Sequence, residues 1–182
     1  HSNIILIGPD GKIIDAIKRV TADMSSVRQV MPGMTYVFPP AQNKMNPLDI
    51  DCMELVSRLK NGRDVPLSKA LMENLDGVSP IVCREISDIV TGGFDTKAHD
   101  LSDSECEKLE TCLEKIAEII KNGNAAPYMV IEENGHPLDF TFIKVSQYGD
   151  SMEIREFETF SEMLDKFFEN YLVYIFLKDE NK

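Results

Sequence analysis

The sequence predicts an α+β fold with a small β-lobe, a helical region that contains a helix-hairpin-helix, and a C-terminal β-meander with a final helix. Two observations carry this prediction. β-rich runs joined by turns occupy both ends of the chain, and the middle has apolar residues at helical spacing. With 182 residues, 43% of them hydrophobic, the chain can bury one core or two small ones. The expected domains are 1–40 (β-lobe), 41–63 (linker and helix), 64–123 (helical region) and 124–182 (C-terminal α/β segment).

The first third predicts a hairpin followed by irregular chain. Glycine in the turn Pro9-Asp10-Gly11 supplies the positive φ that joins two β-rich runs. Pro39-Pro40 ends the last expected strand in an extended conformation. In chain order, the expected elements are strands at Asn3–Ile7 and Lys12–Lys18, a loop or single helical turn at 21–29, a strand at Thr35–Phe38 and a polar linker at 41–48.

Four helical segments are predicted next, because each has apolar residues along one stripe and a glycine or asparagine stop signal behind it. Their expected spans are Asp49–Lys60, Leu67–Leu75, Pro80–Val90 and Ser104–Lys121.

The last third returns to β-type patterning. Asn134-Gly135 is a hairpin turn signal, and Thr159 or Ser161 is the expected cap of the final helix. The expected strands are Tyr128–Glu132, Leu138–Val145 and Met152–Phe157.

The net charge of −12 is unevenly distributed. Residues 1–69 carry a net +2 and the remainder −14, so the first third permits contact with a polyanion that the rest repels. No apolar run approaches the ~18 residues that a bilayer-spanning helix needs. The four cysteines lack CxxC spacing, which favours reduced thiols in a cytoplasmic protein over structural zinc.

The turn between the second and third predicted helices is the first candidate binding site. Gly77, Val78 and Ser79 lie where a helix-hairpin-helix presents backbone N–H groups and a helix dipole to phosphate. Ser79 replaces the second glycine of that motif, and Pro80 lacks an N–H group, so the expected site is weak. Arg84 is the nearest cation. A hairpin used only for packing explains the pattern equally well.

Lys18, Arg19 and Arg28 form a second candidate phosphate contact near the end of the first hairpin. A solvated strand edge is an equally good interpretation of the same residues.

No catalytic constellation is recognisable in the sequence. The three histidines, His1, His99 and His136, have no nucleophile or carboxylate at catalytic spacing. There is no GxxxxGK phosphate loop and no dinucleotide fingerprint. We therefore expect a protein that is not an enzyme and has no cofactor or metal. The acidic residues that begin the fourth helix favour a helix start over a metal site; they are Asp100, Asp103, Glu105 and Glu107.

Several blocks resemble the NFACT amino-terminal domain of the fibronectin-binding protein A/RqcH family. They are HSNIILIGPDGKIIDAIKRV with MSSVRQVMPGMTYVFPP, the hairpin region 67–86, Pro137-Leu138-Asp139-Phe140, and the run FSEMLDKFF at 160–168. Together they extend almost from end to end. In that family a lobe similar to formamidopyrimidine-DNA glycosylases precedes a helix-hairpin-helix, and a coiled coil follows.

The resemblance implies a cytoplasmic factor that binds stalled large ribosomal subunits and alanyl-tRNA and adds an alanine tail to nascent chains. It also implies that this chain is a fragment, because the start of the lobe, with an Asp-Arg pair used for tRNA, has no counterpart here. A fibronectin-binding adhesin is the alternative function, and a glycosylase-like enzyme follows only from the lobe's fold. No membrane partner is expected. An incomplete lobe would leave a strand edge exposed, so we expect pairing with a second copy, as a homodimer, or with the later β-segment.

Overall fold

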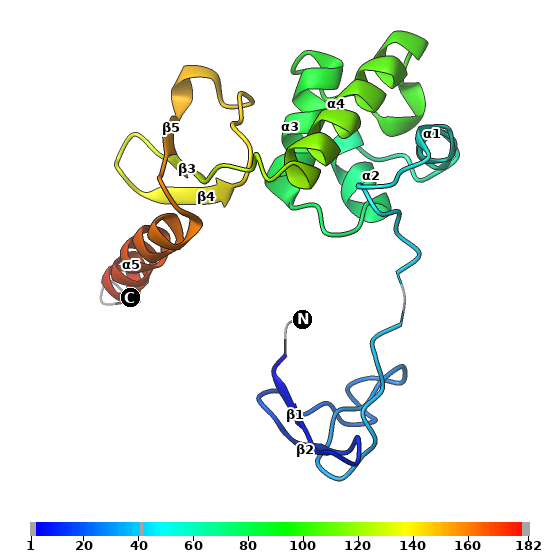
Figure 1. Cartoon of the computed structure of the whole chain (residues 1–182), viewed down its shortest axis with the longest axis vertical. Coiled ribbons are helices and arrows are strands. Elements are labelled where there is room, and N and C mark those ends of the chain that lie inside the picture. The colour runs from blue at the N-terminus through cyan, green and yellow to red at the C-terminus, as the bar shows by residue number, and fades with distance from the viewer. Residues whose placement is uncertain (1–2, 41, 180–182) are drawn as a thin grey trace. The chain divides into compact units, whose positions relative to one another are not determined.

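The computed structural model describes residues 3–40 and 42–179. The chain divides into two compact units, His1–Gln42 and Asn43–Lys182 (Figure 1). The predicted α+β class is confirmed, with helices and two small antiparallel sheets.

The first unit is built on a hairpin of β1 (Ile5–Ile7) and β2 (Ile13–Ala16), joined through Gly11 at a φ of 75°. The predicted strand at 35–38 is wrong, because only Thr35 makes a bridge, with Lys12. The loop before it turns back on itself, since Val20 and Val30 exchange two backbone hydrogen bonds of 2.9 and 2.8 Å.

The sheet of this hairpin contains only β1 and β2 among the described residues. The expected pairing of this edge, with a second copy or with the later β-segment, stays a prediction.

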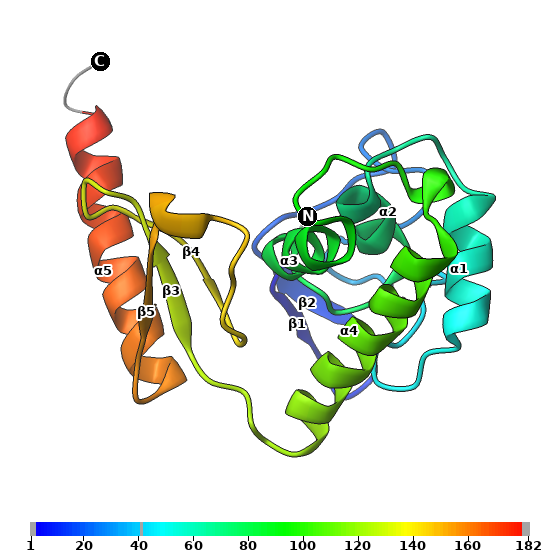
Figure 2. The ribbon, with the colours of Figure 1, turned by 90° about the horizontal axis from the view of Figure 1, so that it is seen from above.

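The second unit begins with a helical layer, whose elements are α1 (Cys52–Lys60), α2 (Leu67–Asn74), α3 (Pro80–Thr91), the short helix η1 (Ala98–Asp100) and α4 (Asp103–Lys121) (Figure 2). The first helix starts three residues later than predicted because the Asp51 carboxylate accepts a hydrogen bond from the Glu54 N–H. Gly92 ends α3 at a φ of 68°, as its stop signal predicted. Ser102 and Glu105 form a capping box at α4, so part of the acidic cluster is a helix start.

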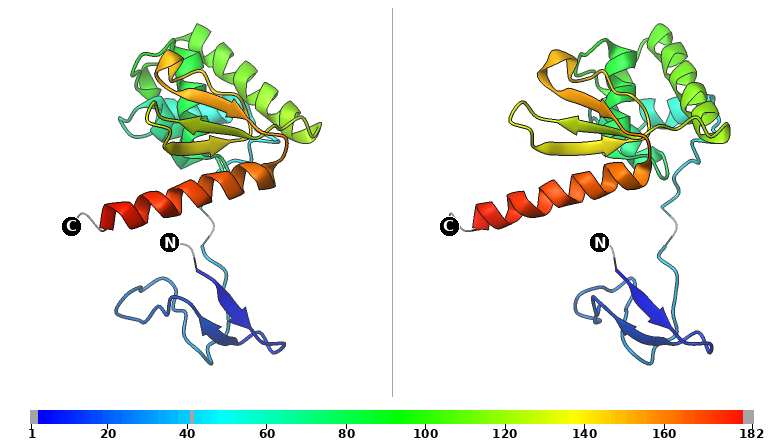
Figure 3. Two further views of the ribbon diagram at one scale, coloured as in Figure 1. Left: turned by 90° about the vertical axis from the view of Figure 1, so that its left-hand side faces the viewer. Right: turned by 60° about the vertical axis from the view of Figure 1, so that its left-hand side comes forward.

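The C-terminal part is a three-stranded sheet of β3 (Tyr128–Ile131), β4 (Pro137–Thr141) and β5 (Glu153–Glu156), with α5 (Phe160–Asp179) along one face (Figure 3). A second short helix, η2 (Gly149–Ser151), precedes β5. Thr159 is the cap of α5, since its hydroxyl accepts from the Glu162 N–H. Met129 and Ile131 pack with Met163 and Phe167 of this helix.

The strand order is β4-β3-β5, so the predicted meander is wrong. The chain leaves the sheet at Thr141, four residues before the predicted end of that strand. Beyond it, the Glu85 carboxylate on α3 accepts hydrogen bonds from the Ser146 and Gln147 N–H groups. Because this anchor draws the connection towards α3, the last strand returns at the free edge of β3.

The main core lies among α1–α4 and extends to Val130 of β3 and Val145 of the anchored connection. Val130 is fully buried on this side, whereas its neighbours Met129 and Ile131 face α5. Because successive side chains of β3 point to opposite faces of the sheet, this strand contributes to both hydrophobic cores.

Candidate nucleic-acid interface

The turn between α2 and α3 is built around an open glycine. Gly77 lies at a φ of 67°, and a β-carbon placed there would meet no atom within 4 Å. The glycine is thus required by its backbone conformation and faces open space. Ser79 is the N-cap of α3, but its side chain makes no capping hydrogen bond, and Pro80 occupies the first helical position. The positive end of the helix dipole is therefore not neutralised by a side-chain cap.

A segment expected to be a linker holds this turn in place. The Met45 N–H donates to the Asn74 carbonyl at 2.7 Å, and the Asp76 N–H donates to the Met45 carbonyl at 2.9 Å. Met45 and Leu75 thus form a parallel bridge, and Leu75 leaves the helix in an extended conformation. This bridge ends α2 one residue before the predicted boundary.

Two cations lie near the start of α3. Burial raises the pKa of the Cys83 thiol to about 11, while the positive charges of Lys44 and Arg84 oppose that rise. Sequence reasoning missed Lys44, because it occupies the segment expected to be a linker. The only local signal was a cation directly before an apolar residue.

Arg84 is partly committed elsewhere in the second unit. Its guanidinium lies 3.5 Å from the Asp139 carboxylate on β4 and 3.4 Å from the Tyr148 hydroxyl. Lys44 makes no ion pair with any residue that the structure describes, so it is the freer of the two cations.

The three predicted cations of the first unit differ in how they are held. Lys18 is exposed, and Asn3 fixes its backbone by hydrogen bonds of 2.9 and 2.7 Å. Arg19 lies 3.2 Å from Asp15, and the pKa of that carboxyl is lowered by the Ala16 N–H and then by Arg19. Lys18 is therefore more available for a phosphate than Arg19.

Arg28 has a structural role within the first unit. Its Nε donates to the Val37 carbonyl, and its guanidinium stacks over the Tyr36 ring at 5.0 Å from the centroid. It thereby ties the loop at 21–29 to the segment after Thr35. The predicted basic cluster is divided between one free cation and two that contact the protein itself.

The four cysteines are free thiols. Within the described residues, no helix is both long and apolar enough to span a bilayer.

A β-hairpin lobe, a two-helix unit around an open glycine turn, and a small sheet with a long helix define an α+β module. The chain belongs to the family described as NFACT N-terminal and middle domains, which it matches over residues 1–179.

Relatives of known sequence extend well beyond this chain. It is 30% identical over 174 residues to Rqc2 homolog RqcH of Bacillus subtilis (strain 168). That alignment covers 92% of this chain and 27% of the relative. The chain thus spans about a quarter of the length of this relative.

Solved structures show the same fold. The fibrinogen binding protein from Staphylococcus aureus superposes with a TM-score of 0.64 at 28% identity, covering 92% of this chain and 55% of that one. The N-terminal part of the fibronectin/fibrinogen-binding protein from Streptococcus suis gives a TM-score of 0.57 at 22% identity, covering 93% and 53%. The second likeness concerns the fold alone.

Proposed function

We propose that this protein is part of a ribosome-associated quality-control factor that acts by binding, not as an enzyme. Its partners would be the stalled large ribosomal subunit and alanyl-tRNA, in the cytoplasm, and the whole factor would promote alanine tailing of nascent chains. The observation that carries this proposal is the similarity to Rqc2 homolog RqcH over 92% of the chain.

Within this factor, the turn between α2 and α3 would contact the RNA backbone. Such contacts use backbone N–H groups, helix N-termini and cations, and they do not read sequence. Gly77 lets a phosphate approach the backbone, and the uncapped start of α3 supplies a partial positive charge. Because Pro80 removes one N–H donor, Lys44 would supply most of the attraction.

Binding by this chain should be weak and sensitive to salt, because the chain carries a net charge of −12. With about three phosphate contacts, the logarithm of the affinity should fall with the logarithm of salt concentration with a slope no steeper than about −3. The acidic remainder of the chain lowers the affinity further through repulsion.

The test is co-sedimentation of the whole chain with purified large ribosomal subunits over a salt series. Lys44→Gln should weaken binding about tenfold and make the salt slope shallower by about one. Lys108→Gln, an exposed change on α4 away from the turn, is the matched control. Equal binding by the two variants would contradict the proposed role of this turn.

Gly77→Val tests the approach of the phosphate to the backbone. Valine resists positive φ, so binding should fall by more than the stability does. Gly77→Asn is the control, because asparagine tolerates the left-handed conformation. If melting temperature and binding fall in parallel, or if both variants behave alike, the turn serves packing only.

The cations of the first unit are tested separately. Lys18→Gln with Arg19→Gln should remove a smaller part of the binding, since Arg19 is paired with Asp15. Arg28 is left unchanged, because its loss would disturb the contacts with Tyr36 and Val37. Unchanged binding by this double variant would show that Lys18 and Arg19 are only solvated surface residues.

Binding of fibrinogen or fibronectin is the second candidate function, favoured by the fibrinogen binding protein from Staphylococcus aureus at 28% identity. Surface plasmon resonance on immobilised fibrinogen and fibronectin separates the two. Saturable binding that Lys44→Gln leaves unchanged would favour the adhesin, whereas no binding would favour the ribosomal role.

A further inference from the structure

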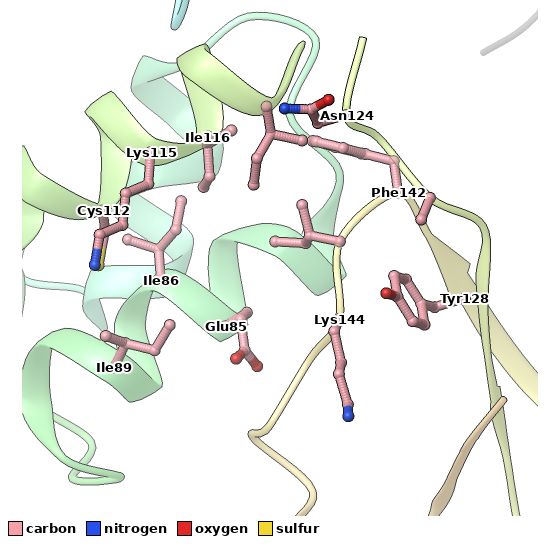
Figure 4. Close-up of a pocket in the computed structure, with 13 residues that line it drawn as sticks. Glu85, Ile86, Ile89, Cys112, Lys115, Ile116, Asn124, Tyr128, Phe142 and Lys144 are labelled. Atoms are coloured by element: carbon pink, nitrogen blue, oxygen red, sulfur yellow. The ribbon is translucent and has the colours of Figure 1, made fainter. Parts of the chain in front are cut away.

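Helix α4 adjoins two hollows of the second unit that differ in how their charges are arranged. The first lies between α3, α4 and the segment after β4, where Lys115 and Lys144 point to opposite sides (Figure 4). Glu85 lies between them, and its oxygens accept hydrogen bonds from Ser146 and Gln147. The charges of this cavity therefore do not converge on one ligand. The second hollow is a groove between α1 and α4, and its charged groups are all acidic.

The groove encloses about 370 Å³ and has an apolar floor. Cys52 and Cys106 line it, and both are half-buried against the main core. Val56 is also half-buried, whereas Met53 lines the groove with 84% of its surface exposed. Methionine is flexible and polarizable, and it is common on surfaces that bind the apolar side chains of other proteins. Met53 and Val56 therefore offer a contact to an apolar side chain from outside.

The wall that α4 contributes to the groove is acidic. Glu107, Glu110 and Glu114 are exposed, and their spacing of three and four residues places them on one face of the helix. Burial raises the pKa of the Cys52 thiol, and the nearby charges of Glu110 and Glu114 raise it further. Within the described part of the chain, none of these glutamates makes an ion pair, and no lysine or arginine lines the groove.

The two helices run in opposite directions along the groove (Figure 2). Lys60, at the end of α1, lies 3.9 Å from the Asp103 carboxylate at the start of α4. Cys52, at the other end of α1, instead lies near Glu110 and Glu114. The groove follows residues 52–57 of α1, which extend over about 9 Å at 1.5 Å per residue. This length fits close to two turns of a partner helix.

The walls of the groove select the kind of partner. Both are helices, so their backbone groups are bonded internally and offer no free edge to which a strand could be added. A partner must therefore bind through side chains, and a helix does so with its own backbone groups already paired. The carboxylates of α4 repel RNA phosphates and attract lysine and arginine side chains.

We propose that the groove between α1 and α4 docks a basic amphipathic helix of a partner protein. Apolar side chains of that helix, spaced three or four residues apart, would pack on Met53 and Val56, and its lysine or arginine side chains would reach Glu107 and Glu110. This surface is separate from the α2–α3 turn, and docking there does not depend on the proposed ribosomal function.

Three synthetic peptides of about four helical turns test the proposal. The leucine-lysine peptide has leucine along one face and lysine elsewhere. The second peptide has glutamate in place of lysine, and the third has the composition of the first in an order that removes the apolar face. Titration of the full chain is followed by the Met53 methyl signal in NMR spectra. The leucine-lysine peptide should shift this signal and bind at least tenfold more tightly than the other two.

Equal binding of the first and third peptides, or an unchanged Met53 signal, would overturn the proposal. Two further titrations address other occupants of the groove. A shift of the Met53 signal on addition of oligouridine would identify RNA as the occupant and contradict a protein partner. A shift on concentrating the chain without peptide would identify a second copy and contradict it equally.

Charge variants locate the binding site. Glu107→Gln with Glu110→Gln should weaken binding of the leucine-lysine peptide about fivefold, because two exposed ion pairs are lost. Glu133→Gln with Glu158→Gln is the matched control, since it removes the same charge from exposed positions next to the sheet. Losses of equal size in the two double variants would mean that only the net charge of the chain attracts the peptide, which would contradict the assignment.

Met53→Asp separates the apolar contact from the charge. Met53 is the second residue of α1, where aspartate interacts favourably with the helix dipole, and thermal unfolding confirms that the variant folds. Attraction by charge alone predicts tighter binding of the leucine-lysine peptide to this variant. Loss of an apolar anchor predicts binding that is weaker by about fivefold or more. The Val56 methyl signals report the titration, and unchanged or tighter binding would overturn the proposed docking.

Discussion

The two units of the chain differ in how well they bury their own apolar residues. In the first, Ile13 and Val30 are the fully buried hydrophobic residues of the described part, while Ile4, Leu6 and Ile17 are 70%, 58% and 72% exposed. In the second, a continuous core includes residues of all four helices and of β3. Burial of apolar surface is the main stabilising term in folding, so we expect the second unit to be the more stable of the two.

This difference should be largest in native-state hydrogen exchange. The Ile13 N–H, which bonds to the Met34 carbonyl, should exchange at least about a thousandfold faster than amides in the middle of α3. Amide-resolved exchange measured by NMR at neutral pH gives the comparison directly. Equal protection in both units would show that they unfold as one and would remove the contrast.

Core truncations should have global effects in one unit and local effects in the other. Leu71→Ala removes a fully buried side chain of α2 and should lower the free energy of unfolding by about 3 kcal/mol. Urea unfolding followed by helical circular dichroism measures this loss, because all described helices longer than three residues lie in the second unit.

Ile13→Ala is the matched change in the first unit. It should leave the helical transition unchanged while the Val30 methyl signals in NMR spectra collapse to disordered positions. A lowered helical midpoint in this variant would mean that the first unit contributes to the stability of the second.

Substitutions of Glu85 test a buried polar group of the second unit. Glu85→Leu leaves the Ser146 and Gln147 N–H groups without their acceptor, so the free energy of unfolding should fall by about 2–3 kcal/mol. Glu85→Gln keeps one acceptor oxygen and should lose less. Denaturant unfolding of the two variants checks the order; equal losses would show that the packing of this side chain outweighs its hydrogen bonds.

The smallest effect is expected at the α4 cap. Ser102→Ala removes the side-chain cap and should lower the free energy of unfolding by about 1 kcal/mol. Thermal unfolding at neutral pH measures this loss. Ser104→Ala, two residues further along the chain and within the helix, is the control.

The same cap should make stability depend on pH. The Ser102 hydroxyl and N–H lower the pKa of Glu105 from its ordinary value of 4.5. A carboxyl with a lowered pKa stabilises the folded state above its unfolded pKa, and this stabilisation is lost as the pH falls through the folded pKa. The wild-type chain should therefore lose more stability than Ser102→Ala on acidification below about pH 4.5. Parallel curves would exclude this linkage.

Much of the second unit could be predicted from the sequence because its signals are local. The periodicity of α3 and α4 and the positive φ at Gly77 and Gly92 require only neighbouring residues. The predicted strand at 35–38 is wrong because Thr35 is its only residue with a bridging partner. Strand propensity does not show whether a partner strand is present.

The candidate sites depend more on contacts between distant residues. Gly77 could be recognised from the turn alone, but Lys44 comes near α3 only through the bridge between Met45 and Leu75. Arg84 looked like a free cation until the sheet placed Asp139 beside it.

The sequence by itself determined the α+β class, the helix caps and the glycine turn, because these follow from backbone preferences within a few residues. Only the tertiary structure decided the strand order β4-β3-β5 and the packing of Val145 into the main core. Both depend on Glu85, whose carboxylate reaches across 61 positions of the chain to Ser146. No local pattern marks that residue as buried, since a glutamate on a helix is normally solvated and becomes a core residue only when distant donors satisfy its charge.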